Sequence, residues 1–289
     1  MIQIMVKNNL YLWLSVMMLL GASIGHASAT TTGNERKSNM ATEQLAADLA
    51  VVRKGRFLFS HHSVGVNIIM GIQRLDGETP GGNHIRLATL DEADVSEGPM
   101  LIHFTGGQNG QPKTKIDAFA AAIRNEPHLR PDLAFLKFCF VDFNPRTDVD
   151  ELFKYYRNTI EALKREHPEI RFAHVTVPLT LRPTELKWKI FRLIGKEVWD
   201  DASNVKRAEF NRRLKETFGS DPIFDLSLVE ATAPDGHLTT FEQGGQSYLS
   251  LYPGYTEDGG HLNTLGQKVA GEATIRFMAE GLKGRGSAR

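Results

Sequence analysis

The sequence has little cysteine and no excess of charge of either sign. Cys139 is the one cysteine among 289 residues, so no disulfide can form within the chain. A chain of this length buries enough apolar surface to fold without one. The 34 basic residues balance the 34 acidic residues, whereas nucleic-acid binders carry an excess of positive charge. A disulfide-stapled fold and a nucleic-acid partner are therefore both excluded.

Charge is also missing from the stretch between Leu10 and Gly25, which is rich in Leu, Met and Ile. Lys7 precedes it, and Ala27-Ser28-Ala29 follows with the small residues of a cleavage site. This pattern predicts a secretory signal peptide over residues 1–29, an exported (periplasmic or secreted) protein, and no stable membrane insertion after cleavage. An uncleaved membrane anchor is the alternative. The polar residues 30–41 are expected to be a disordered linker.

Residues 42–289 are expected to form a single α/β domain. Apolar runs alternate with segments of helical periodicity, which favours a mostly parallel sheet of five strands covered by helices on both faces. Strands are predicted near 56–60, 84–90, 132–142, 170–177 and 223–226, and helices near 42–53, 64–75, 113–125, 149–166, 202–218 and 263–282. Two long loops are expected, at 91–112 and 231–260. Cys139 falls in a predicted buried strand, a setting that argues against a catalytic thiol.

Two distant stretches carry residues suited to catalysis. Ser63 follows the strand 56–60 directly and precedes Gly65 and a helix, which predicts an exposed hydroxyl on a sharp turn at the carboxyl edge of the sheet. Asp258 and His261 lie just before the last helix, spaced so that the carboxylate can orient the imidazole. Ser63, His261 and Asp258 therefore predict a nucleophile, a general base and its orienting acid. The alternative is that Ser63 caps its helix and Asp258 only makes a turn.

In these stretches the chain resembles the SGNH hydrolases of the GDSL-like group. Ser63 matches the family serine, and Asp258 with His261 matches its closing Asp-x-x-His. The resemblance implies a flavodoxin-like three-layer α/β sandwich. It also implies an oxyanion hole made by the Ser63 N–H, a glycine (Gly106 or Gly107, with Gly107 preferred) and Asn144. His61-His62-Ser63 replaces the family's Gly-Asp-Ser, and Val141-Asp142-Phe143-Asn144 replaces its Gly-x-Asn-Asp.

Other residues near these blocks have two interpretations each. Asn109 is a second candidate for the amide donor, with turn chemistry as the alternative for Asn109, Asn144 and Gly107. His62 is expected to hold the serine loop by hydrogen bonds and to lie near the substrate. A zinc site made by His61, His62, Asp258 and His261 is the less favoured option, because adjacent histidines on an extended chain point to opposite sides.

Two aromatic segments are also ambiguous. Tyr252 and Tyr255 either form a platform for a sugar ring or pack a long loop against the domain. Residues 184–198 hold a basic, aromatic-containing segment around Trp188 and Phe191. An ordinary helix with a solvated basic edge is the favoured interpretation there, and a lid or a membrane contact is the alternative.

The sequence predicts an exported serine esterase that needs no cofactor and no metal. The resemblance suggests an O-acyl ester such as an acetyl group, on a small molecule or a cell-envelope glycan. An O-acyltransferase, a metal-dependent hydrolase and a glycan-binding protein on an inactive scaffold remain alternatives.

Overall fold

The structure is a computed structural model that describes residues 23–283. It divides into two compact units, one ending at Ala46 and one beginning at Ala47. Helix α1 (Ser23–Val52) makes up the described part of the first unit and ends in the second. Residues 30–41, predicted to be a disordered linker, are helical here. The segment contains no proline, so nothing in it removes the hydrogen bonds of a helix. Residues 1–22 of the predicted signal peptide lie outside the described residues.

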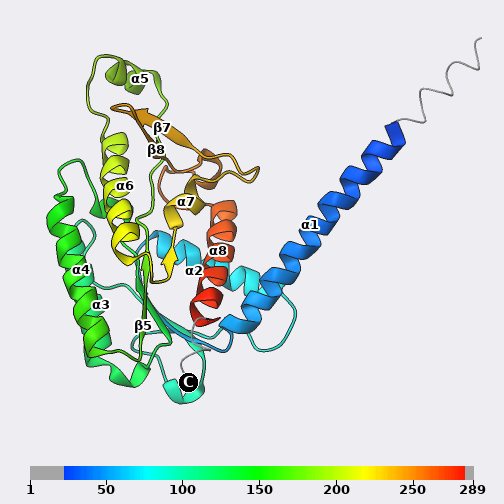
Figure 1. Cartoon of the computed structure of the whole chain (residues 1–289), viewed down its shortest axis with the longest axis vertical. Helices are drawn as coiled ribbons and strands as arrows, with labels where there is room; N and C mark the ends of the chain where they lie inside the picture. Colours follow the sequence, from blue (N-terminus) through cyan, green and yellow to red (C-terminus); the bar gives the residue numbers. More distant parts are fainter. Residues whose placement is uncertain (1–22, 284–289) are drawn as a thin grey trace, which may run out of the picture. The chain divides into compact units, whose positions relative to one another are not determined.

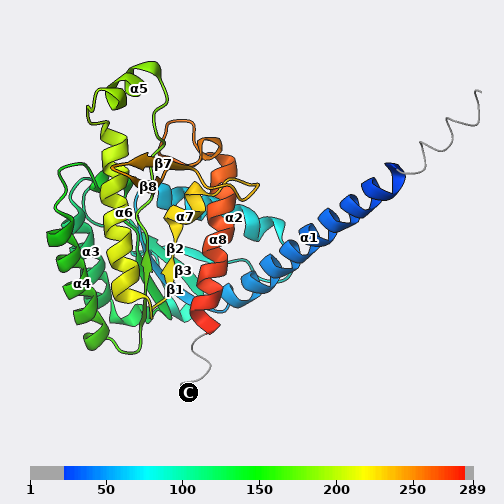
Figure 2. The ribbon, with the colours of Figure 1, turned by 45° about the horizontal axis from the view of Figure 1, so that its top comes forward.

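The second unit is built on a parallel sheet, as predicted, but with six strands among the described residues rather than five. Their order is β2-β3-β1-β4-β5-β6, and Figures 1 and 2 show the sheet between two groups of helices. The strands are β1 (Arg56–Ser60), β2 (Leu87–Thr89), β3 (Met100–Phe104), β4 (Leu133–Leu136), β5 (Arg171–Val175) and β6 (Ile223–Phe224). Every pairing in this sheet is parallel, so the carboxyl ends of all six strands meet at one edge.

Helices cover both faces of the sheet, which confirms the three-layer α/β architecture. One face carries α3 (Pro112–Asn125), α4 (Val149–Glu166) and α6 (Trp199–Phe218) over a core that includes Phe138 and Phe210. The other face carries α2 (Val64–Glu78) and α8 (Thr264–Lys283), where Phe135 stacks on Phe59 and meets Phe277 edge-on. Because both faces are buried, most residues of the central strands are apolar, as in Phe57-Leu58-Phe59 of β1.

Three sequence predictions need correction. β3 lies inside residues 91–112, predicted as a loop, because the glycines around it obscured an apolar run of only five residues. The strand predicted at 132–142 ends at Leu136, and the chain turns into a short 3₁₀ helix, η3 (Phe140–Asp142). The predicted loop 231–260 contains an antiparallel hairpin, β7 (Thr240–Gln243) with β8 (Gln246–Leu249).

The remaining elements are short. They are the 3₁₀ helices η1 (Val95–Glu97), η2 (Pro127–Leu129) and η4 (Pro253–Tyr255), and the helices α5 (Leu186–Leu193) and α7 (Leu226–Ala231). Within residues 23–283, no helix has both the length and the apolar character that a membrane crossing requires.

A close crossing of α2 and α8 brings the two ends of the domain together. A Cβ atom built on Gly71 would lie 1.9 Å from the carbonyl oxygen of Gln267, and one on Gly271 would lie 2.6 Å from the backbone of Gly71. The two backbones therefore touch at these glycines, where no larger residue fits. Ser63 immediately precedes α2 and His261 lies three residues before α8, so this crossing sets the distance between the two residues.

Candidate active site

Ser63 occupies a strained turn between β1 and α2. Its φ of 50° and ψ of −103° lie in a region that L-residues rarely adopt. A Cβ on Gly65 would lie 2.3 Å from the Cβ of His61, so the turn requires glycine at that position. Ser63 is the N-cap residue of α2, yet its side chain makes no capping hydrogen bond. The hydroxyl is therefore free of the structural role that serine usually has at this position.

The Ser63 hydroxyl is instead paired with His261. Ser63 Oγ lies within hydrogen-bond distance of Nε2 of His261, across 198 positions of sequence. The other ring nitrogen, Nδ1, lies 2.6 Å from Oδ2 of Asp258. Because a carboxylate only accepts hydrogen bonds, Nδ1 carries the proton and Nε2 is left to accept from the serine. The structure thus brings together the three residues that the sequence predicts as a triad.

Asp258 is held as an anion by its surroundings. Its Oδ1 accepts the backbone N–H groups of Gly260 (2.9 Å) and His261 (2.8 Å). The N–H of Gly260 and then the His261 ring lower the pKa of the Asp258 carboxyl well below its usual range. The carboxylate is therefore ionised and available to a protonated imidazole at any pH near neutral.

Three contacts that the sequence did not predict hold the loop that carries His261. Asn67, on the first turn of α2, accepts the N–H of Leu262 at 3.1 Å. The N–H of Leu181 donates to the carbonyl of Gly259 at 2.7 Å. The ring of Phe140 meets the His261 ring edge-on, with centroids 5.4 Å apart. These contacts join the loop to α2, to the segment after β5 and to η3, and so fix the imidazole.

The two histidines before Ser63 point to different partners. The Nε2 of His62 lies 2.9 Å from the carbonyl oxygen of Gly106, which ties the serine turn to the loop after β3. His61 is buried, and its Nε2 lies 3.3 Å from Nδ1 of His103. Burial, and then the nearby Lys137, lowers the pKa of His61 to about 3. Both histidines are thus engaged in holding the strand ends together.

His61 makes the fold sensitive to acid. The unfolded chain takes up a proton at this residue below a pKa of 6.5, whereas the folded chain stays neutral down to about 3. Folding stability therefore falls as pH drops through this window, by about 1.4 kcal/mol per pH unit. The free energy of unfolding, measured with urea at pH 7 and at pH 5, should fall between these two pH values by about 2 kcal/mol more in the wild type than in His61→Gln. An equal loss in both proteins would contradict this assignment, whatever the absolute stability of the variant.

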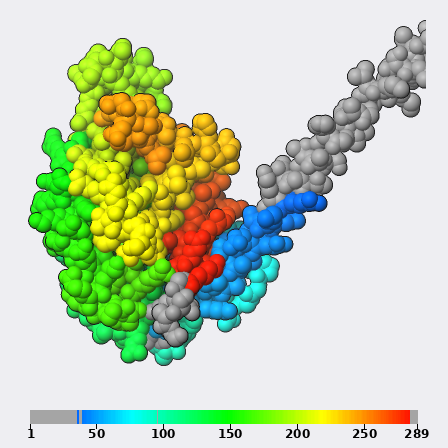
Figure 3. Space-filling view, viewed as in Figure 1, coloured from blue at the N-terminus to red at the C-terminus, as the bar shows by residue number. Residues whose placement is uncertain are grey.

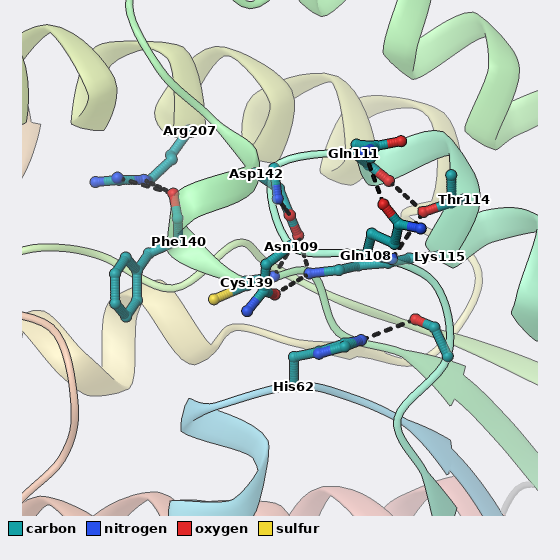
Figure 4. Close-up of polar contacts among 12 residues, drawn as sticks. His62, Gln108, Asn109, Gln111, Thr114, Lys115, Cys139, Phe140, Asp142 and Arg207 are labelled. Carbon is teal, nitrogen blue, oxygen red and sulfur yellow. Dashed lines mark hydrogen bonds and ion pairs between the residues drawn. The ribbon is translucent and has the colours of Figure 1, made fainter.

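The loop after β3 is fixed by a buried ion pair (Figure 4). Nζ of Lys115 lies 2.6 Å from Oδ2 of Asp142, and both side chains are fully buried. Lys115 also donates to Oδ1 of Asn109 at 2.8 Å. Asp142 in turn accepts the N–H groups of Gly110 (2.9 Å) and Cys139 (2.7 Å). The loops that follow β3 and β4 are therefore locked to one another, and the Asn109 oxygen is bound to an ammonium group.

Gly107 and Asn144 have different surroundings. Gly107 has a φ of +73°, and a Cβ there would lie 2.5 Å from the backbone nitrogen of Lys115, so this position needs glycine. Asn144 forms a turn in which its Oδ1 accepts the N–H of Arg146 at 2.8 Å. Its backbone also exchanges hydrogen bonds with Thr147. Asn144 thus shows the turn chemistry that was its alternative interpretation.

The tyrosine platform needs correction at Tyr255. This side chain is 2% exposed, and its hydroxyl donates to the carbonyl of Thr232 at 2.8 Å. A buried ring cannot contact a sugar, so Tyr255 packs its loop against α7. Tyr252 is half-buried and packs edge-on against Tyr255 with centroids 4.9 Å apart.

Two further charged side chains are buried in this unit. Lys137 and Glu230 are both inaccessible to solvent. Burial lowers the pKa of Lys137 and raises the pKa of Glu230. Lys137 was missed because it falls in a run that otherwise predicts an apolar strand. In the described part of the chain, no three His, Cys, Asp or Glu side chains are grouped so that they could hold a metal ion.

Comparison with known proteins gives matches among solved structures. No protein-family model matches the sequence, and no curated protein matches it. A candidate platelet activating factor from Streptococcus pneumoniae is 14% identical, with 87% of this chain and 99% of that one covered and a TM-score of 0.43. A peptidoglycan O-acetylesterase is 13% identical over 65% of this chain and 48% of its own, with a TM-score of 0.41. A protein assigned to the G-D-S-L lipolytic family from Desulfitobacterium hafniense is 10% identical over 77% and 99%, with a TM-score of 0.40.

Of these three structures, the last carries the G-D-S-L family name. The chain itself has the order of elements that the sequence predicts, with Ser63 in the turn after β1 and Asp258 and His261 before the last described helix of a parallel α/β sandwich.

Proposed function

We propose that this chain is an exported serine esterase that cleaves an O-acyl ester through a covalent acyl-enzyme. One observation carries the proposal. Ser63 stands at the N-cap of α2 without capping it, in a strained conformation, and its hydroxyl is paired with His261. Backbone strain and a missing capping hydrogen bond both lower folding stability. Such features are expected at a residue whose side chain takes part in a reaction.

The geometry supports a two-step mechanism. Ser63 Oγ attacks the ester carbonyl carbon while its proton passes to Nε2 of His261. Asp258 stabilises the imidazolium through Nδ1. The tetrahedral intermediate collapses, the alcohol leaves with the proton from Nε2, and an acyl group remains on Ser63. Water then attacks this ester, again giving its proton to Nε2, and releases the acid and the free serine.

Asn109 is the amide donor that we assign to the oxyanion hole, in place of Asn144. Its Oδ1 is held by the ammonium of Lys115, which fixes the amide plane and leaves the NH₂ group as the free end. The Ser63 and Gly107 N–H groups are the other proposed donors. A preorganised donor of this kind contributes to catalysis because it needs no reorientation as charge develops.

A pair of alanine variants tests this assignment. Asn109→Ala should lower kcat by about 10²- to 10³-fold with little change in KM, the loss typical of one oxyanion donor. Asn144→Ala removes an asparagine at the same edge of the sheet and serves as the matched control, with a loss below about tenfold. A larger loss of kcat in Asn144→Ala than in Asn109→Ala would instead identify Asn144 as the oxyanion donor.

The proposed site is open rather than enclosed. The side chains of His261 and Asp258 are 49% and 57% exposed. Such a site can receive an ester carried on a large molecule, so an acyl group on an envelope glycan fits it as well as a small ester does. The same openness admits a sugar hydroxyl in place of water, which would make the enzyme an acyltransferase.

Incubation with a small chromogenic acetyl ester tests the proposal. The chain from Thr30 onward should release the chromophore, and His261→Ala should lose most of this activity. Product analysis with an added acceptor sugar then separates the reactions, because free acetate indicates a hydrolase and an acetylated sugar indicates a transferase. Failure to cleave any ester from acetyl to butyryl, by protein with a cooperative unfolding transition, would refute the assignment.

A further inference from the structure

Helix α5 presents its apolar side to solvent. Leu186, Ile190 and Leu193 follow one another at helical spacings of four and three, so they share one face. They are 72%, 45% and 85% exposed, and Ile194 at the C-cap is 58% exposed. No residue of α5 is buried. An ordinary surface helix shows the reverse pattern, with its apolar stripe toward the core.

Contacts on the opposite side hold α5 in this orientation. Trp188, Phe191 and Arg192 are half-buried. Nε of Arg192 lies 2.6 Å from Oδ2 of the buried Asp201, and its Nη2 donates to the carbonyl of Pro183 at 2.8 Å. The outward direction of Leu186, Ile190 and Leu193 is therefore set by the fold.

The charge of α5 has one sign. Its charged residues are Lys187, Lys189 and Arg192, and the last of these is neutralised by Asp201. Lys187 and Lys189 are both exposed and lie on either side of the apolar stripe. Lysines that flank leucine and isoleucine on an exposed helix fit a surface with hydrocarbon beneath a layer of phosphate.

The helix lies at the same edge of the sheet as Ser63. It follows the carboxyl end of β5, and Ser63 follows the carboxyl end of the parallel strand β1. Figure 3 shows this segment, in lime, standing out beside the orange β7–β8 hairpin. The chain leading into α5 also contacts the His261 loop, since the N–H of Leu181 donates to the carbonyl of Gly259.

We propose that α5 docks the protein on an anionic phospholipid bilayer, with Leu186, Ile190 and Leu193 entering the acyl-chain boundary and Lys187 and Lys189 contacting lipid phosphates. Docking would place the Ser63 edge of the domain at the membrane surface. The sequence alone favoured an ordinary helix with a solvated basic edge for this segment, with a lid or a membrane contact as the alternative. Lys187 and Lys189 are exposed, as the first interpretation expects, and the exposed apolar residues favour the membrane contact.

Vesicle sedimentation tests the proposal with the chain from Thr30 onward, which contains every strand and all of α2–α8 but lacks the apolar run before Gly25. The protein should bind vesicles of phosphatidylglycerol and phosphatidylethanolamine more tightly than vesicles of phosphatidylcholine. Leu186→Ser/Ile190→Ser/Leu193→Ser should lower the partition coefficient by more than about tenfold. Lys187→Gln/Lys189→Gln should reduce binding to anionic vesicles by about fivefold for each lysine.

A matched control is Leu228→Ser/Leu238→Ser, which removes two exposed leucines elsewhere on the domain. It should bind like the wild type, and thermal unfolding should show that all variants fold. Equal binding by the wild type and the triple variant would overturn the proposal. A second result would also overturn it: the wild type binds no vesicles but self-associates, and only the triple variant loses this self-association. That result would show that the apolar face of α5 contacts protein instead of lipid.

Discussion

Ser63→Ala is expected to lower kcat for ester hydrolysis by about 10⁴- to 10⁶-fold while leaving the fold intact. The reason is that Ser63 supplies the atom that forms the new bond, and His261 has no other hydroxyl paired with its Nε2 among the described residues. Alanine keeps the Cβ, so the backbone of the turn is unchanged. Initial rates with a chromogenic acetyl ester measure the effect, and a loss of less than tenfold would contradict it.

Ser63→Gly provides an internal control for the strain argument. Glycine adopts a φ of 50° without a steric penalty, so this variant should be as inactive as Ser63→Ala but more stable than it. The free energy of unfolding of Ser63→Gly should exceed that of Ser63→Ala by about 1 kcal/mol. Urea unfolding of the two variants side by side gives the difference.

The second large effect is expected at the buried ion pair. Lys115→Met removes the ammonium and leaves the Asp142 carboxylate fully buried with only backbone N–H partners. An uncompensated buried charge of this kind costs about 3–5 kcal/mol of folding stability. Ester hydrolysis should fall as well, because Asn109 loses the group that orients its amide.

Lys113→Met is the matched control for this change. Lys113 lies on the same helix and pairs with Glu151, but the two side chains are 43% and 64% exposed. Its loss should therefore cost less than about 1 kcal/mol. The double variant Lys115→Met/Asp142→Asn should lose less folding stability than Lys115→Met and Asp142→Asn lose together, because no buried charge is left in the double variant. Strict additivity, or equal effects of Lys113→Met and Lys115→Met, would refute the role of the pair.

The sequence predicted the parts of the fold that depend on local periodicity. The strand 56–60, the helix after Ser63 and the last helix all follow from apolar spacing, and alternation of strands with helices gave the parallel sheet. β3 was missed because five apolar residues flanked by glycines fit a loop as well as a strand. The contact of Gly71 with Gly271, which brings the two ends of the domain together, left no signal in either helix alone.

The site was predictable where chemistry follows from residue type and order. Ser63, Asp258 and His261 each lie next to an element boundary that the sequence marks. The role of Lys115 could not be predicted, because a lysine inside a predicted amphipathic helix is usually solvated. Only the folded chain shows that it is buried against Asp142 and holds Asn109. The orientation of α5 was likewise beyond sequence reasoning, since periodicity predicts a helix with an apolar face but not which way that face points.

Covalent labelling tests the central claim, that Ser63 is an activated nucleophile, most directly. The folded chain from Thr30 onward would be treated with an organophosphorus serine reagent, digested and mapped by mass spectrometry. The account predicts one phosphorylated serine, Ser63, with labelling abolished in Ser63→Ala and much slowed in His261→Ala. An enzyme that still cleaves esters after such treatment with Ser63 unmodified, or that carries the label on another residue, would contradict it.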